Sequence, residues 1–132
     1  MKKLLILYLF TMLFATISYA QSSGRQTPTI VEDIARYKLY STKNMWTFLK
    51  LDTRTGKIWQ VQWSTENNKQ FEYPLSTVSQ VWEDEEVNGR FELYPTTNNF
   101  NFVMLDRING NTYQVQWSQE KENRLIVPIS SN

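Results

Sequence analysis

Two aspartates, Asp52 and Asp106, are the first candidates for chemistry because they occupy matching positions of a repeated segment. Two carboxyl groups that share one proton across a twofold axis would form the dyad of an aspartic protease. That family carries aspartate, threonine and glycine in succession, whereas here Gly56 follows Asp52 by four residues and Arg107 follows Asp106. Aspartate also accepts backbone hydrogen bonds in turns, and glycine adopts the positive φ that tight turns need. The spacing therefore favours two turns over a catalytic dyad.

Other catalytic and metal-binding groups are scarce. The chain has no histidine and no cysteine, which excludes an imidazole base, a Ser-His-Asp or Cys-His arrangement, zinc bound by histidine, and disulfides. The acidic run Glu83–Glu86 lacks the alternating carboxylates and internal glycine of a calcium loop. The remaining acids lie in charge runs or on the solvent side of predicted strands, unlike the inward pair of a glycosidase. We predict no enzyme activity, no cofactor and no metal site.

The chain contains an internal duplication. Residues 36–76 align without a gap onto residues 90–130 at an offset of 54, and 17 of the 41 pairs are identical. Similar segments precede both copies, which places the two repeat units at about 28–78 and 79–132 within one domain of residues 28–132. Positions that two diverged copies still share are those that the repeat tolerates least.

Ten polar residues are shared between the copies without being explained by turns. We expect them on the strand face opposite the clear apolar positions and in the following loop. There they could hydrogen-bond a sugar or a peptide, with Trp46 or Phe100 as an apolar ring. They could instead form amide ladders and a polar network that the fold requires, which we favour because polar groups beside a core usually satisfy one another. The candidate ligand-binding residues are Arg36, Tyr40, Asn44, Gln60, Gln62, Arg90, Tyr94, Asn98, Gln114 and Gln116.

Both copies show the period of β-strands. Large apolar residues alternate with glutamine in 59–63 and 113–117, which indicates strands with one buried face and places Trp59, Trp63 and Trp117 in the core. Nearly continuous apolar runs at 46–51 and 100–105 predict central strands covered on both faces. The remaining strands are predicted at 36–42, 71–75, 90–96 and 125–129, with Pro74 and Pro128 on an edge or at a bulge.

About eight strands and no long helical pattern predict an all-β fold. It would consist of two tandem four-stranded meander repeats with pseudo-twofold symmetry. The two repeats would form a small flattened barrel or a sandwich, and we expect the barrel.

The first twenty residues predict an export signal. Lys2 and Lys3 precede an apolar run, and Ser18, Tyr19 and Ala20 precede the expected cleavage site. The run is shorter than the ~20 residues of a membrane span, so we expect no stable membrane insertion after cleavage. A leader at 21–27 follows. Removing the two lysines changes the formal net charge from +1 to −1, which gives no basic field for nucleic acid. We predict a periplasmic or extracellular protein.

Two resemblances follow from these motifs. The stretch 51–59, LDTRTGKIW, resembles the hairpin of pyrroloquinoline-quinone-type β-propeller repeats. The second copy departs from it, with Asn109 for the threonine and Tyr113 for the tryptophan. Two repeats are too few for the blades of a propeller, so the resemblance is taken to imply a hairpin only, without the cofactor. More generally, the elements LDxxxG and WQVQW resemble small secreted proteins without a known activity from Bacteroides-type bacteria. That resemblance implies a compartment but no activity.

The sequence therefore predicts an exported, non-catalytic β-domain that binds a glycan, a peptide or a protein in the cell envelope or outside the cell. One alternative is a structural or assembly subunit whose edge strands near Pro74 and Pro128 pair with another chain. Another is a small inhibitor of a hydrolase, with its decisive residues in loop 42–45 or loop 96–99.

Overall fold

The computed structural model describes residues 35–130. The predicted export signal, the leader at 21–27 and the start of the first repeat lie outside these residues. Among the described residues, no helix has the length and apolar composition that crossing a membrane requires.

Each repeat forms one antiparallel sheet in which every strand pairs with its neighbours in sequence, as the duplication predicts. Sheet 1 consists of β1 (Tyr37–Ser41), β2 (Thr47–Asp52), β3 (Ile58–Gln62) and β4 (Phe71–Ser76). Sheet 2 consists of β5 (Phe91–Pro95), β6 (Asn101–Asp106), β7 (Thr112–Gln116) and β8 (Leu125–Pro128). The described loops also hold the short 3-10 helices η2 (Asn67–Lys69), η3 (Glu83–Glu85) and η4 (Lys121–Asn123).

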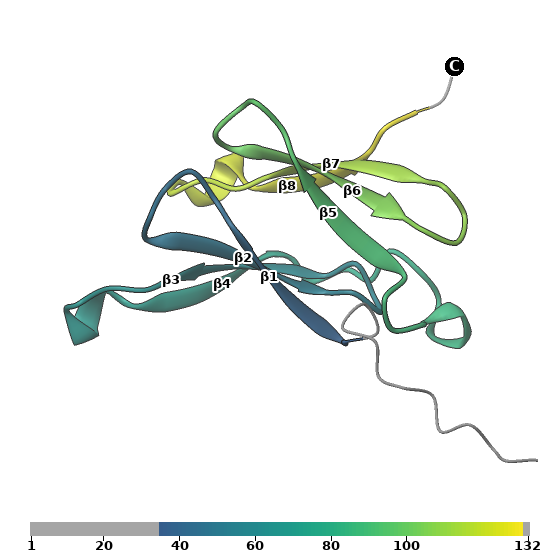
Figure 1. Ribbon diagram of the computed structural model, residues 1–132, viewed down its shortest axis with the longest axis horizontal. Helices are drawn as coiled ribbons and strands as arrows, with labels where there is room; N and C mark the ends of the chain where they lie inside the picture. Colours follow the sequence, from purple (N-terminus) through teal and green to yellow (C-terminus); the bar gives the residue numbers. More distant parts are fainter. Residues whose placement is uncertain (1–34, 131–132) are drawn as a thin grey trace, which may run out of the picture.

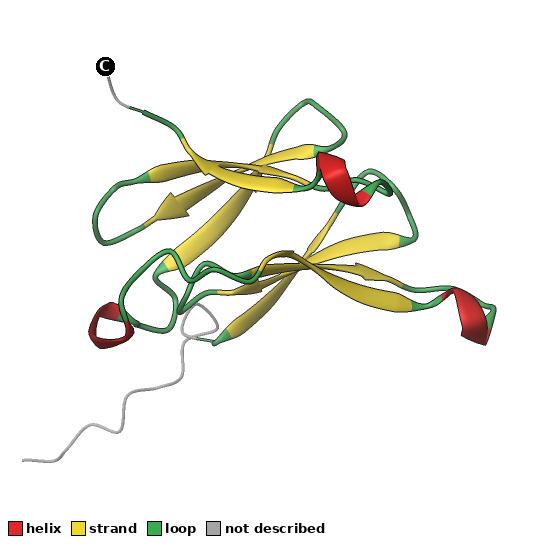
Figure 2. Ribbon diagram, turned by 180° about the vertical axis from the view of Figure 1, so that it is seen from behind, coloured by secondary structure: helices red, strands yellow, loops and turns green. Residues whose placement is uncertain are grey.

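The two sheets lie face to face and are joined by the connection 77–90 (Figures 1 and 2). Between the layers, β2 lies next to β5 and β4 lies next to β8. The predicted tandem meanders are thus confirmed as a sandwich. The expected barrel is not formed, because closing it would require β4 to pair with β5 and β8 with β1. Pro74, Pro95 and Pro128 lie on three of those edge strands and have no N–H to donate.

The two sheets bury different faces of the repeat. In sheet 1, Leu49 and Leu51 point inward and are fully buried. Their equivalents in sheet 2, Val103 and Leu105, lie on the solvent side and are partly exposed. The inner face of sheet 2 is formed by the alternate set of positions: Phe91, Leu93, Phe102, Met104, Tyr113 and Val115.

The packing between the sheets is therefore head to tail. A twofold axis would bring the same face of each repeat into the interface, whereas here one face of the repeat packs on the opposite face of the next copy. The expected pseudo-twofold relation is not found. The apolar residues of β2 and β6 allow this arrangement, because both strands carry apolar side chains on both faces.

Each sheet keeps one face open to solvent, so the prediction that β2 and β6 are covered on both sides is wrong. We call these surfaces outer face 1 and outer face 2. Outer face 1 consists of Tyr37, Leu39, Phe48, Lys50, Trp59 and Val61 on β1, β2 and β3, with Glu72 and Pro74 on β4. Outer face 2 includes Glu92, Tyr94, Val103, Leu105, Thr112, Gln114 and Val127.

The two predicted turns are confirmed. Gly56 and Gly110 have φ values of 75° and 76°, which glycine adopts without a steric penalty. Asp52 accepts a hydrogen bond from the backbone N–H of Arg54 at 3.0 Å, and Asp106 accepts one from Ile108 at 2.9 Å. Both aspartates therefore shape the hairpins that join β2 to β3 and β6 to β7.

Candidate functional site

The ten predicted ligand-binding residues do not form one site. In sheet 2, Tyr94 and Gln114 lie on outer face 2, opposite the buried apolar positions, as predicted. In sheet 1, their equivalents Tyr40 and Gln60 lie on the inner face together with Leu49. The prediction fails for sheet 1 because that sheet buries the face that carries the amides.

Gln60 shows the consequence most clearly. Its side chain is fully buried, and neither its amide oxygen nor its amide nitrogen has a hydrogen-bond partner among the described residues. Gln114, its equivalent, is exposed and donates to Asn101 at 3.1 Å. Gln60 therefore cannot contact a ligand from solvent. Burial also raises the pKa of the neighbouring Tyr40 hydroxyl above its ordinary 10.0.

Arg36 and Arg90 form structural ion pairs with the two turn aspartates. Arg90 and Asp106 are almost completely buried, and the guanidinium makes two-pronged contact with the carboxylate at 2.8–3.1 Å. Arg90 also donates to the backbone carbonyl of Glu85 at 2.7 Å. The equivalent Arg36 reaches Asp52 with one nitrogen at 3.2 Å and is half exposed. These arginines secure the hairpin ends and leave no pair of free carboxylates.

The Arg90 pair also fixes the charge of Asp106. Burial alone would raise the pKa of this carboxyl group. Hydrogen bonds from Arg90 and from the backbone N–H groups of Ile108 and Asn109 outweigh that effect, so the pKa of Asp106 lies below its ordinary 3.8. Asp106 is therefore a carboxylate near neutral pH, unsuited to donate a proton as a catalytic acid.

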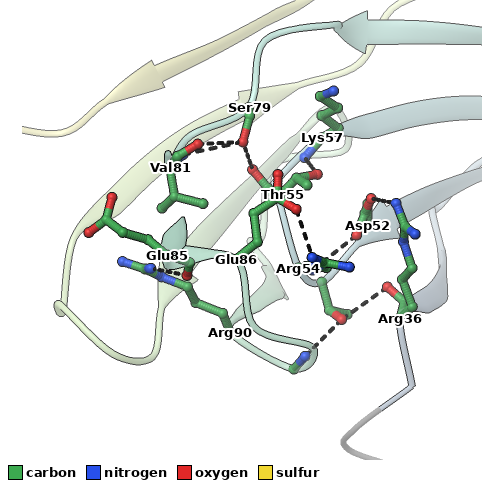
Figure 3. Close-up of polar contacts among 12 residues, drawn as sticks. Arg36, Asp52, Arg54, Thr55, Lys57, Ser79, Val81, Glu85, Glu86 and Arg90 are labelled. Carbon is green, nitrogen blue, oxygen red and sulfur yellow. Dashed lines mark hydrogen bonds and ion pairs between the residues drawn. The ribbon is translucent and has the colours of Figure 1, made fainter. Parts of the chain in front are cut away.

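The turn 52–57 of sheet 1 holds the connection between the sheets (Figure 3). The hydroxyl of Thr53 accepts from the N–H of Gly89 at 2.9 Å, and the Thr53 carbonyl accepts from the N–H of Phe91 at 2.8 Å. The Thr55 carbonyl accepts from the N–H of Gln80 at 2.8 Å. Arg54 pairs with Glu86 of the connection at 3.0 Å. The acidic run therefore contributes an ion pair to the contact between the connection and sheet 1.

Asn44 and Asn98 hold the loops at the other end of each sheet. The side-chain oxygen of Asn44 accepts from the N–H of Trp46 at 2.9 Å, and that of Asn98 accepts from the N–H of Phe100 at 2.8 Å. Matching hydrogen bonds from Thr42 and Thr96 to loop carbonyls complete the same structure in both copies. These shared residues therefore have a structural explanation.

Two of the predicted residues, Asn98 and Gln116, do come together, at the loop end of sheet 2. A cavity of about 460 Å³ there is lined by Asn98, Phe100, Gln116 and Gln119, among others. The Gln119 amide reaches Gln62 of sheet 1 at 3.4 Å. However, the Gln116 amide already donates to a backbone carbonyl of the same loop at 2.8 Å. The groups that would recognise a sugar are largely used within the protein.

The predicted core tryptophans differ in burial. Trp117 is 2% exposed, whereas Trp63 is 42% exposed and Trp59 is partly exposed on outer face 1. The core prediction is therefore confirmed for Trp117 and wrong for Trp63. Trp59 is displaced to the surface because sheet 1 packs through its other face.

Outer face 1 is the surface that the sequence reasoning missed. Tyr37 and Leu39 are exposed on it, and Phe48, Trp59 and Val61 are partly exposed. The apolar residues on both faces of the strand 46–51 are the sequence feature that indicates this surface, although by themselves they predict a strand covered on both sides.

Lys50 lies at the centre of this aromatic surface. Its ammonium group is 4.8 Å from the centre of the Trp59 ring and 5.8 Å from that of Tyr37, and it pairs with Glu72. Tyr37 and Trp59 also meet edge to face, with 6.5 Å between ring centres. Because the ammonium group is held over the rings and has a counter-ion, the face is apolar with a compensated charge.

In the described part of the chain, no group of three or more acidic side chains is placed to hold a metal ion. No family model matches the chain, and no curated protein or solved structure is significantly similar to it.

Proposed function

We propose that the mature chain is an exported, non-catalytic interaction domain that binds a protein surface through outer face 1. The observation that supports this function is the exposure of Tyr37 and Leu39 beside Phe48, Trp59 and Val61 on a regular sheet. A continuous apolar surface of this kind on a soluble domain marks an interaction site. The predicted signal at 1–20 supports export to the envelope or beyond it.

The chemistry of outer face 1 favours a protein over a sugar. Aromatic residues with few charges are typical of the centre of protein interfaces. The cations at this face are already paired: Lys50, over the rings of Trp59 and Tyr37, with Glu72, and Arg36, over the ring of Tyr37, with Asp52. A flat partner surface could therefore cover the face without burying a charge that has no counter-ion.

Pairing through edge strands, the alternative that the sequence suggested, has less support. Pro74 and Pro128 lie on β4 and β8, and Pro95 lies on β5. Proline removes a backbone donor from each of these edges, which is how natural sheets resist the addition of another strand. Contact through a sheet face does not need those donors.

The function is tested by retention of envelope proteins on the immobilised mature chain. The variant Leu39→Glu places a charge in outer face 1, and Met45→Glu is its matched control, since Leu39 and Met45 are 64% and 67% exposed and Met45 lies in the β1–β2 loop. We expect the wild type and Met45→Glu to retain the same proteins, and Leu39→Glu to lose them. Equal retention by all three proteins would rule out outer face 1 as the binding surface.

A further inference from the structure

We infer that outer face 1 binds outer face 2 of a second copy of this chain, in the same head-to-tail order in which the two sheets pack within one chain. This inference rests on the proposed function, because it names the partner of outer face 1. It is carried by the internal interface, which already shows how the two faces of the repeat fit together.

Outer face 1 is the equivalent of a buried surface. Leu39 is 64% exposed, whereas its equivalent Leu93 is 3% exposed at the internal interface. Apolar character is kept at five of the six positions on β1, β2 and β3: Tyr37 with Phe91, Leu39 with Leu93, Phe48 with Phe102, Trp59 with Tyr113, and Val61 with Val115. The sixth position has Lys50 in place of Met104, and on β4 Glu72 stands in place of Ile126. Outer face 1 therefore has the composition of the surface by which sheet 2 packs on sheet 1.

Outer face 2 is the equivalent of the inner face of sheet 1, on which sheet 2 packs. Its central residues Val103 and Leu105 correspond to Leu49 and Leu51, both fully buried under sheet 2. Tyrosine and glutamine also recur, as Tyr94 with Tyr40 and Gln114 with Gln60. At the edge of this face, Thr112 stands in place of the buried Ile58, and Glu92 in place of Lys38. Each chain thus has two different outer faces. They correspond to the two surfaces that pack against each other between its sheets, so outer face 1 of one chain is expected to fit outer face 2 of another.

The second turn leaves room for such a neighbour. A Cβ atom on Gly56 would meet Gln80 at 2.8 Å and the end of Met104 at 3.4 Å, because the connection and sheet 2 pack against this turn. A Cβ atom on Gly110 would meet nothing within 4 Å. A second copy seated on outer face 2 would occupy this open space, with Lys50 near the position that Met104 has at Gly56.

The contact between chains is expected to be weaker than the internal one. The side-chain hydroxyl of Thr53 accepts a hydrogen bond from the N–H of Gly89 in the connection, whereas its equivalent, Arg107, has no side-chain acceptor. No covalent link raises the local concentration of a second chain. Association should therefore depend on protein concentration. Because the two faces differ, repeated contacts give a ring if the rotation closes and a filament if it does not.

The inference is tested by sedimentation of the purified mature chain over a dilution series. Two variants each block one face: Leu39→Glu on outer face 1 and Val103→Glu on outer face 2. We expect the mass of the wild type and of Met45→Glu to rise with concentration from one chain to two and beyond, while each blocked variant stays at one chain. An equimolar mixture of the two blocked variants should form species of two chains and none larger, because one intact face remains on each.

Other results overturn the inference. A wild type that stays at one chain at all concentrations contradicts it, and so does association that Val103→Glu leaves unchanged, which would indicate contact between two copies of outer face 1. Val127→Glu, at the edge of outer face 2, replaces Val103→Glu if circular dichroism shows that the latter is unfolded. If the wild type is monomeric but Leu39→Glu still loses envelope proteins, the proposed function stands and its partner is a different protein.

Discussion

The two repeats make the same local contacts and yet differ in what they bury. Trp63 and Trp117 both donate their indole N–H to a loop carbonyl, at 2.9 and 3.1 Å, and both pack at a tilt against an aromatic ring. One is nevertheless exposed and the other buried. The repeat sequence thus determines the strands, turns and loops, whereas its place in the stack determines which face becomes core.

The largest difference between the repeats in their contribution to the free energy of unfolding is expected at the arginine–aspartate pairs. Arg90→Ala leaves the buried Asp106 carboxylate without its cation, which should lower the free energy of unfolding by about 3–5 kcal/mol. Arg36→Ala should change the urea midpoint little, because Arg36 is half exposed and Asp52 keeps its backbone hydrogen bond. Equal losses in urea denaturation would contradict the difference in burial.

The tryptophans isolate the effect of burial itself. Trp117→Ala should cost about 3 kcal/mol of unfolding free energy, because a buried aromatic ring is lost and a cavity remains. Trp63→Ala removes the same indole hydrogen bond and ring contact at an exposed position, so its cost should be clearly smaller. Circular dichroism is the appropriate measurement, because both variants alter fluorescence. A larger loss for Trp63→Ala would reverse the assignment of core and surface.

A smaller change in the free energy of unfolding, this time stabilising, is expected when the buried glutamine is replaced. Gln60→Leu removes a buried amide without hydrogen-bond partners and should stabilise the domain by about 1–3 kcal/mol. Gln114→Leu, at the exposed equivalent, should change stability by no more than about 0.5 kcal/mol. If Gln60→Leu destabilises the fold, its amide must have a partner such as an internal water molecule.

The dependence of stability on pH should trace to the second repeat. The pKa of Asp106 is lowered in the folded state, so its contribution is present above the ordinary value of 3.8 and is lost as the pH falls through the folded pKa. Thermal melting of the wild type and of Asp106→Asn across this acidic range measures the effect. The wild type should lose melting temperature more steeply than the variant, and parallel curves would show that Asp106 is not responsible.

The strands and turns could be predicted from the sequence because their signals are local. Alternation in residues 59–63 and the spacing of Asp52 and Gly56 depend on hydrogen bonds within a single hairpin. The duplication likewise predicted two equal sheets. These features need no knowledge of which sheet face meets another.

The candidate site could not be predicted in the same way. The strand 46–51 has apolar side chains on both faces, so periodicity alone could not show which face turns inward. Gln60 and Gln114 each stand between an aromatic residue and a valine along the chain, yet the stacking of the sheets buries only Gln60. Burial of equivalent residues differs because of tertiary packing, and residues that both copies share, such as Gln60 and Gln114, cannot indicate it.

The simple order of the strands has a consequence for the speed of folding. Each strand pairs only with strands adjacent in sequence, so each hydrogen-bonded pairing closes a short loop at a small cost in chain entropy. All-β domains commonly fold slowly because their pairings join distant segments. Among residues 35–130, the contacts between distant segments are mainly those between the two neighbouring meanders. A sheet protein built in this way is expected to fold fast for its class, with little time for unpaired strands to aggregate.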